Sequence, residues 1–291
     1  MKKIKLISLL LVIVLALVAC GKESANTPED KVFYIGAIPD QDAALLQNNM
    51  DKLADYLSEA TGLNVKYTST VDYAALVTGF EREEVHMAWF GGLTSVQAMA
   101  VAPNAEAIAQ RPRDEEFTSV FIANPSLGLT SLEDIKGRSI TFGSESSTSG
   151  HLMPRYFITQ AGINLDTDIS QAPNFSGSHD TTYKLVEAGT YEVGALNSAV
   201  WESAIRDNKV DTTKVDVFYV TPEYYDYNFT INDLDKEFGE GTKEKVQKAL
   251  LAMGEDQQDI LDFFATDSFI ATNNDNYKAI REVAKSLGII K

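Results

Sequence analysis

Apolar positions in the first third of the chain follow two periods that alternate along the sequence. Runs of strand length cover residues 32–38, 63–68 and 85–90, and segments with apolar residues at helical spacing follow them at 42–60, 72–80 and 94–101. Gly62 stands where the first helix should end, as a C-cap. Strands and helices in this order predict a parallel sheet covered by helices.

The middle of the chain predicts a second α/β unit. Strand patterns occupy residues 117–123, 139–142, 168–172, 191–196 and 215–220, and helical patterns occupy 152–160, 178–189 and 200–208. From residue 243 onward only helical spacing remains. Extended segments near 111–118 and 221–228 would carry the chain out of one lobe and back. We therefore expect an α/β fold of two lobes with a double-crossover hinge, in which lobe 1 comprises 32–115 and 223–291 and lobe 2 comprises 116–222.

The first twenty residues are typical of an export signal. Lys2, Lys3 and Lys5 precede an apolar run at 6–19 that is short for a membrane span. The end of this run, 17–20, resembles a bacterial lipobox, in which Cys20 becomes the lipidated first residue; the alternative is a single N-terminal anchor helix. More than one acyl chain anchors a protein stably. We expect residues 1–20 to be a lipoprotein signal peptide, residues 21–31 to be a polar tether, and the protein to be exported and anchored on the outer face of the cell membrane.

Charge and cysteine content limit the partners. The chain has 25 Lys and Arg against 42 Asp and Glu, a net charge of −17, and loss of the leader with its three lysines would leave −20. This balance argues against nucleic acid. It allows a small anion, provided that the site is built from aimed N–H and O–H dipoles. Cys20 is the only cysteine, which rules out a disulfide framework.

A cluster of hydroxyl residues lies where a predicted strand turns into a predicted helix. Five of the six residues 144–149 are Ser or Thr, between the strand at 139–142 and the helix that starts near 152. The first N–H groups of a helix have no internal partner and carry partial positive charge. With the hydroxyls of Ser147, Thr148 and Ser149 and the turn at Gly150, they predict an uncharged ring of donors for a tetrahedral oxyanion. The alternative is an ordinary Ser/Thr N-cap, which needs only one such residue.

Other candidates follow from the rule that ligands bind beyond the carboxyl ends of the strands in such sheets. Gly91 and Gly92 would open a second helix N-terminus toward an anion, or else form a tight turn. A neutral His179 in the first turn of a helix could donate to an anion, or lie on the surface. The strand ends and nearby aromatic residues that complete the candidate set are Asp40, Tyr73, Trp89, Phe90, Asn197 and Tyr225.

The sequence resembles the solute-binding lipoproteins of ABC importers, in the phosphate/phosphite/phosphonate-binding family. The segments that carry the resemblance span nearly the whole mature chain: 38–40, 89–92, 147–150, 178–180 and 224–228. Residues 142–157 are closest to the branch labelled selenate-binding. The resemblance implies a type II periplasmic binding protein fold, with two lobes closing on the ligand. It also implies that Ser147, Thr148, Ser149 and His179 hold the oxyanion, that Trp89 or Phe90 lines the pocket, and that permease subunits with a cytoplasmic ATPase are the partners.

Protonation narrows the choice of oxyanion. Sulfate and selenate carry no proton at neutral pH and suit a site made of donors only, whereas phosphate, phosphite and phosphonates can carry one. A buried acceptor carboxylate would therefore favour the phosphorus oxyanions. The candidate acceptors are Asp40, Asp180 and Asp226. We expect a phosphonate-type, phosphite or phosphate ligand, with selenate or sulfate as the alternative; the neutral Asn197 argues against a ligand that bears an amine.

Two other classes of function compete with ligand capture. Ser147, His179 and Asp180 could form a hydrolase, but the chain has no Gly-x-Ser-x-Gly elbow. A lipoprotein that presents its ligand to a surface sensor is the other alternative. The three histidines, His86, His151 and His179, lack metal-binding spacing, and we expect no metal, no cofactor and no catalysis. We expect Arg111 and Arg113 to be solvated surface residues; the alternative is that they contact the anion.

Overall fold

The computed structural model describes residues 31–290. The predicted signal peptide, the lipidation site Cys20 and nearly all of the tether lie outside these residues. Within the described part, no helix combines the length and the apolar character that crossing a bilayer requires.

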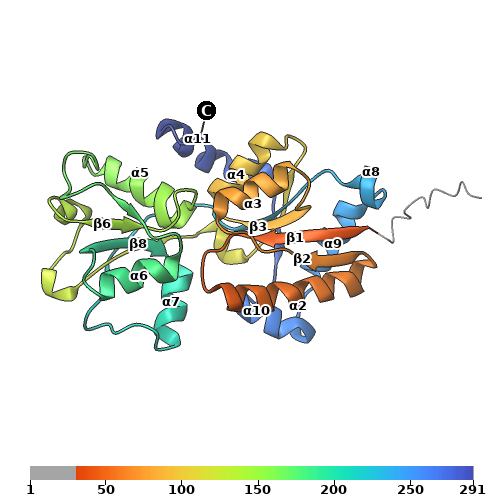
Figure 1. The fold of residues 1–291 in the computed structure, drawn as a ribbon, viewed down its shortest axis with the longest axis horizontal. Helices are drawn as coiled ribbons and strands as arrows, with labels where there is room; N and C mark the ends of the chain where they lie inside the picture. The colour runs from red at the N-terminus through yellow and green to blue at the C-terminus, as the bar shows by residue number, and fades with distance from the viewer. Residues whose placement is uncertain (1–30, 291) are drawn as a thin grey trace, which may run out of the picture. The chain divides into compact units, whose positions relative to one another are not determined.

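The first sheet has six strands in the order β11-β4-β10-β3-β1-β2 (Figure 1). Their bounds are β1 Val32–Ala37, β2 Asn64–Tyr67, β3 Met87–Phe90, β4 Glu106–Gln110, β10 Asn228–Ile231 and β11 Ile270–Ala271. β1 pairs in parallel with β2 and β3, but β10 is antiparallel to β3 and β4, and β11 is antiparallel to β4. The parallel pairing predicted for the strands of the first third of the chain is thus confirmed. β10 and β11 run the other way, because the chain returns from the second sheet and enters the first from the opposite end.

The second sheet has five strands in the order β7-β6-β8-β5-β9. Their bounds are β5 Ser119–Ala123, β6 Ile140–Phe142, β7 Asn174–Phe175, β8 Val193–Asn197 and β9 Asp216–Val220. The strand predicted at 168–172 is wrong, because this segment is a turn in which Asp168 accepts hydrogen bonds from the backbone N–H of Asn164 and the hydroxyl of Thr167. Such side-chain acceptors offer the backbone an alternative to a strand ladder.

Helices cover both sheets, as their alternation with strands predicted. We call the first sheet with α2–α4 and α8–α11 the first lobe, and the second sheet with α5–α7 the second lobe. The bounds are α2 Ala43–Thr61, α3 Tyr73–Glu81, α4 Gly92–Val101, α5 Met153–Gln160, α6 His179–Glu187, α7 Ser198–Arg206, α8 Asp235–Phe238, α9 Thr242–Leu251, α10 Gln258–Phe263 and α11 Lys278–Ser286. Gly62 ends α2 at φ 73°, which confirms its prediction as a C-cap. The expectation that only helices follow residue 243 is wrong, since β11 pairs with β4.

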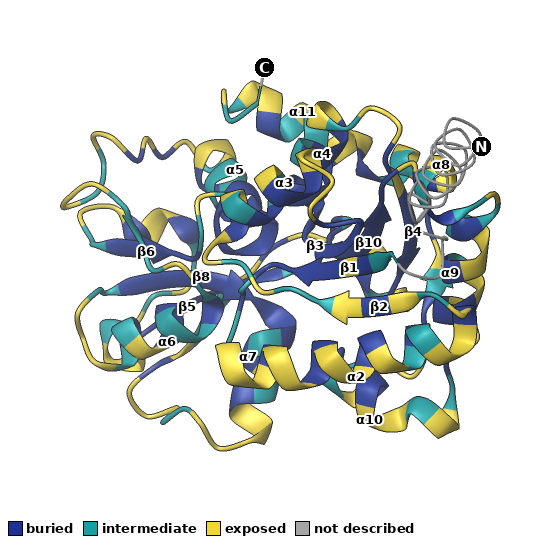
Figure 2. Ribbon diagram, turned by 45° about the vertical axis from the view of Figure 1, so that its right-hand side comes forward, coloured by how far each residue is buried: buried dark blue, intermediate teal, exposed yellow. Residues whose placement is uncertain are grey.

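The chain crosses between the lobes twice, at neighbouring positions. Phe117 on the way out and Tyr224 on the way back exchange two backbone hydrogen bonds of 2.9 Å. Figure 2 shows central strands such as β1, β3, β10 and β8 as mostly buried, the edge strand β2 as partly exposed, and the outward faces of helices such as α2 as exposed. The carboxyl ends of β1, β3, β6 and β8 supply the loops that form the candidate site described next.

Candidate functional site

The antiparallel direction of β10 brings an acidic residue to the carboxyl end of β3. Asn228, the first residue of β10, pairs with Phe90, the last residue of β3. Asp226, two residues earlier, therefore lies beside the loop that leaves β3. Its Oδ1 accepts a hydrogen bond of 2.9 Å from the backbone N–H of Gly92, the first residue of α4.

The hydroxyl cluster forms the start of a helix, as predicted, but the first turn is wide. Residues Thr148–Leu152 form a π-helical turn, η5, that runs directly into α5. Ser147 caps this turn, because its Oγ accepts a hydrogen bond of 2.9 Å from the backbone N–H of Gly150. Ser147, Thr148, Ser149 and Gly150 are all buried. A π-helical turn is rare and often occurs at functional sites.

Thr148 joins the second lobe to the first across the cleft. Its Oγ1 accepts a hydrogen bond of 2.9 Å from the backbone N–H of Leu93. The N–H groups of Gly92 and Leu93 are thus occupied by Asp226 and Thr148 in this structure. A Cβ atom at Gly91 would lie 3.1 Å from Thr148 Oγ1 and 3.2 Å from Asp226 Oδ1, so a residue without a side chain allows this close approach.

Three buried polar atoms around this junction have no hydrogen-bond partner: Tyr73 Oη, Ser149 Oγ and Asp226 Oδ2. The Ser147 hydroxyl lies close enough to Tyr73 to influence its ionisation, and the hydroxyls of Thr148 and Ser149 do the same for Asp226. Buried polar groups without a partner are uncommon and call for an unseen one. Two hydroxyl donors and one carboxylate acceptor match the oxygens and the proton of a monoprotonated oxyanion.

Burial controls the charge of Asp226. It raises the pKa of this carboxyl from 3.8 to about 7, against the opposing effects of the Gly92 N–H and the Thr148 hydroxyl. The hydrogen bonds to Oδ1 are too few to offset the loss of water. Near neutral pH the carboxyl can therefore either accept a proton from a ligand or hold one itself.

A second polar group, next to the first, links the two lobes. The Tyr227 hydroxyl donates to Asp40 Oδ2 over 2.9 Å and accepts from Asn197 Nδ2 over 2.8 Å. Burial raises the pKa of Asp40 to about 6, while the Tyr227 hydrogen bond and the Arg111 charge oppose the rise. Asp40 and Tyr227 belong to the first lobe and Asn197 to the second, so this group spans the cleft.

His179 is neutral and faces the same tyrosine. Burial lowers its pKa to about 4. Its Nδ1 accepts a hydrogen bond of 3.4 Å from the backbone N–H of Asn197, so Nε2 carries the proton and lies 3.4 Å from the Tyr227 hydroxyl. Tyr227 was not among the site residues predicted from the sequence. Tyr227 lies just before β10, and this position would have pointed to the site only if the antiparallel pairing of β10 had been known.

The other predicted residues occupy different places. Trp89 stacks on Tyr227 with ring centroids 5.4 Å apart, and both line a cavity of about 40 Å³. Phe90 is fully buried in the first-lobe core and packs on Phe80. Tyr225 is half-buried and packs on Tyr277. Among the aromatic candidates, Tyr73 is the one with a fully buried polar atom that lacks a hydrogen-bond partner.

Of the three candidate acceptor acids, Asp226 is the one with a buried carboxylate oxygen that has no hydrogen-bond partner. The Asp180 carboxylate already accepts hydrogen bonds from the Ser178 hydroxyl over 2.6 Å and the Lys184 ammonium over 3.0 Å. Asp40 is engaged by Tyr227, as described above. The carboxylate oxygen at the junction that can still accept a hydrogen bond from a ligand is therefore Asp226 Oδ2.

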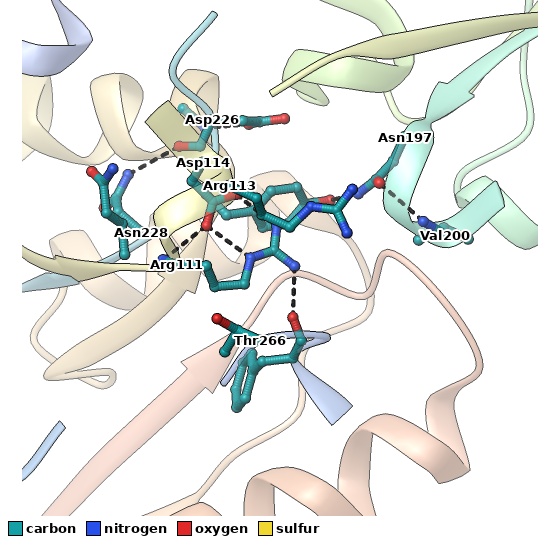
Figure 3. A network of polar contacts seen from close by, with 12 residues as sticks. Arg111, Arg113, Asp114, Asn197, Val200, Asp226, Asn228 and Thr266 are labelled. Carbon is teal, nitrogen blue, oxygen red and sulfur yellow. Dashed lines mark hydrogen bonds and ion pairs between the residues drawn. The ribbon is translucent and has the colours of Figure 1, made fainter. Parts of the chain in front are cut away.

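Arg111 is a structural residue of the hinge. It is buried, so the expectation of a solvated surface arginine is wrong for Arg111. Figure 3 shows its guanidinium between Asp114 and the backbone of the segment before Thr266. Nε and Nη2 donate to the two carboxylate oxygens of Asp114 over 2.8 and 2.6 Å, and Nη1 donates to the carbonyl oxygen of Phe264 over 2.9 Å. Its charge is thus neutralised within the protein.

Comparison with known proteins consistently finds binding proteins of phosphorus oxyanion transporters. Residues 35–277 match the family described as "ABC transporter, phosphonate, periplasmic substrate-binding protein". A protein of Prochlorococcus marinus named "Probable ABC transporter phosphite binding protein PhnD1" is 41% identical over 271 residues, which is 90% of this chain and 91% of that protein. The structure of PhnD1 from this organism in complex with methylphosphonate has a TM-score of 0.86 and 40% identity, and the match covers 91% of this chain and all of that chain. The "Phosphate-import protein PhnD" of Mycolicibacterium smegmatis is 26% identical over 207 residues, 67% of this chain and 62% of that protein.

Proposed function

Because this chain belongs to the periplasmic substrate-binding proteins of phosphonate ABC transporters, with the fold of type II periplasmic binding proteins, we propose that it captures a monoprotonated phosphorus oxyanion. The ligand class comprises phosphite, methylphosphonate and phosphate. The protein would deliver this ligand to permease subunits that are driven by a cytoplasmic ATPase.

The observation that carries this proposal is the free oxygen of Asp226 beside free hydroxyl donors. The hydroxyls of Ser149 and Tyr73 can donate to two ligand oxygens, and Asp226 Oδ2 can accept the proton of a third. The methylphosphonate complex of PhnD1, a close relative, supports the same ligand class.

An acceptor carboxylate also discriminates against the alternative ligands. Sulfate and selenate have no proton to donate, so an ionised Asp226 would repel them at hydrogen-bond distance. Sulfate or selenate could bind only if Asp226 were protonated, so that the carboxyl group donates its proton in a hydrogen bond to the ligand. A selenate or sulfate binder of the same fold is therefore the second candidate, and it differs from the first in the protonation state of one residue.

Titration of the protein with a series of anions tests the proposal. We expect phosphite, methylphosphonate or phosphate to stabilise it, by about 2.7 kcal/mol at 100 times the Kd, and sulfate and selenate to have no effect. Asp226→Asn should weaken binding of the phosphorus oxyanions and raise the relative affinity for sulfate, because an amide can donate to an unprotonated oxygen. Asp180→Asn is the matched control, since its carboxylate is engaged by Ser178 and Lys184. Stabilisation by sulfate or selenate alone, or only by a sugar or an amino acid, would overturn the proposal.

Membrane attachment is a separate part of the proposal. Lipidation of Cys20 would hold the domain at the outer face of the membrane by a tether of residues 21–31. Mass spectrometry of the protein from native membranes would detect the acylated N-terminus. Its solubility after Cys20→Ala, with ligand binding unchanged, would separate anchoring from capture.

We also propose that the protein does not catalyse a reaction. Ser147 Oγ accepts from the Gly150 N–H, and the proton of His179 Nε2 points to Tyr227, so His179 is not aligned as a base for Ser147. We expect no turnover of a phosphomonoester. Turnover that is lost in Ser147→Ala would favour the hydrolase instead, and unimpaired anion uptake after deletion of the gene would favour the sensor.

A further inference from the structure

The C-terminal helix α11 lies against both elements that build the oxyanion site. It packs on α4, whose first N–H groups meet Asp226 and Thr148, and it also contacts η5, which carries the hydroxyl cluster. Figure 1 shows α11 above the junction of the lobes, between α5 and α4. A helix of the first lobe thus reaches the second lobe behind the site.

Two side chains of the second lobe are buried in the core of the first. Leu152, at the end of η5, is 0% exposed and Met153, at the start of α5, is 5% exposed. Both belong to the apolar cluster that contains the first-lobe core, including Ile280 and Ala284 of α11. By contrast Ile158, one turn further along α5, lies in a separate cluster of the second lobe. The first residues of α5 therefore pack across the lobe boundary.

Near its start α11 contacts α4, and at its end it is closed by a local cap. Near its start, Ile280 lies against Gly92, since a Cβ atom at Gly92 would be 3.4 Å from Ile280 Cγ1. After its end, Gly288 at φ 68° allows the Ile289 N–H to bond to the Ala284 carbonyl over 2.9 Å. Between them, Leu287 borders a groove of about 390 Å³ together with Arg155 and Thr159 of α5.

We propose that α11 is an interlobe clasp, which holds the cleft closed through apolar contacts of Leu152 and Met153 and so contributes to ligand affinity without touching the ligand. Separation of the lobes would expose these side chains to water, and their burial favours the closed arrangement whether or not a ligand is present. A ligand that binds the closed arrangement then spends less of its binding free energy on closure. The clasp rests on the proposed function only in that the proposed ligand serves as the probe of closure.

Paired substitutions on α5 test the clasp. Met153→Ala should weaken binding of phosphite or methylphosphonate by up to about tenfold, because it removes apolar burial that exists only in the closed arrangement. Ile158→Ala is the matched control: it removes a buried side chain of the second-lobe core, and it should lower the melting temperature without changing the affinity. Leu287→Ala, on a half-buried residue just after α11, should weaken binding in the same direction as Met153→Ala.

A measurement without ligand separates the clasp from the proposed ligand. Spin labels at Asp55→Cys in α2 and Thr190→Cys after α6, both exposed, would report the distance between the lobes in a full-length Cys20→Ala background. Met153→Ala and Leu287→Ala should shift the ligand-free distances toward a more open distribution, and Ile158→Ala should not. Unchanged distances in Met153→Ala and Leu287→Ala, or an equal shift in Ile158→Ala, would overturn the clasp. Failure of every phosphorus oxyanion to bind would overturn the proposed function and leave this distance test intact.

Discussion

The backbone N–H of His179 donates a hydrogen bond of 3.0 Å to the carbonyl oxygen of Asp40. His179 begins α6 of the second lobe, and Asp40 follows β1 of the first. The same two residues meet again through their side chains, because each lies within reach of the Tyr227 hydroxyl. The lobes are thus joined beside the proposed oxyanion site by groups that need not touch the ligand.

Removal of one hydroxyl tests this junction. Tyr227→Phe should weaken ligand binding by about tenfold, because the Asn197 amide and the Asp40 carboxylate each lose a buried partner when the lobes meet. The loss should appear mainly as faster dissociation in stopped-flow measurements. Tyr56→Phe is the control: its hydroxyl bonds to the Ala249 carbonyl within the first lobe, so stability should fall and affinity should not. Equal affinity of Tyr227→Phe and the wild type would contradict the prediction.

The unpartnered hydroxyl of Ser149 should matter only when ligand is bound. We expect Ser149→Ala to weaken oxyanion binding by about tenfold to a hundredfold, the range for a hydrogen bond to a charged group. The melting temperature without ligand should not fall, since no hydrogen bond of Ser149 Oγ is lost. Calorimetric titration and thermal unfolding measure the two effects. Ser144→Ala in the same loop should leave affinity unchanged, and a drop in ligand-free stability of Ser149→Ala would show that the hydroxyl has a structural partner.

The raised pKa of Asp226 predicts how stability depends on pH. Between pH 3.8 and about 7 the unfolded chain ionises this carboxyl and the folded protein does not, so its contribution to stability is full below pH 3.8 and is lost as the pH rises through 7. Asp226→Asn, which stays neutral, should therefore be more stable than the wild type above pH 7, by an amount on the order of 4 kcal/mol.

The difference between variant and wild type isolates this residue. The lowered pKa of His179 acts in the opposite direction, because its stabilisation is lost as the pH falls from 6.5 toward 4. Both proteins share that effect, so it cancels when their free energies of unfolding are subtracted. A difference that does not grow between pH 5 and 8 would mean that Asp226 is ionised at an ordinary pKa.

The buried ion pair of the hinge should support folding more than binding. Arg111→Ala leaves the Asp114 carboxylate buried without its cation, and we expect a loss of about 3–5 kcal/mol in the free energy of unfolding. The double variant Arg111→Ala with Asp114→Ala should recover part of that loss. Affinity per folded molecule should change little. A large loss of affinity in Arg111→Ala, with stability preserved, would instead make Arg111 an anion partner.

The part of the site that lies on one continuous stretch could be predicted from the sequence. The run of hydroxyls at 144–149 and the helix behind it require only local rules for caps and turns. The strand-end rule likewise pointed to Asp40, Asn197 and the loop after β3. These elements depend on short-range periodicity, which the chain displays directly.

The part that depends on the reversed strand could not be predicted. β10 runs antiparallel to β3, and this single fact puts Asp226 beside Gly92 and Tyr227 beside Asp40. Strand direction is decided by which strand edges pair in space, and the chain from 221 to 231 has no local signal for it. The position of α11 is a similar case, since its apolar face fits any core of suitable shape until the packing with η5 is known.

Asp226 is attached directly to the returning crossover: its own N–H bonds to the Asp114 carbonyl of the outgoing one over 3.0 Å. A lineage that adapts to a new oxyanion by replacing Asp226 would keep this backbone bond but lose the side-chain bond to the Gly92 N–H. The hydroxyls of the turn are linked to the same place, because Thr148 accepts from the Leu93 N–H and Ser149 influences the ionisation of Tyr224 on the returning crossover. We therefore expect the residues at 148, 149 and 226 to change together when ligand preference diversifies in descendants of this protein.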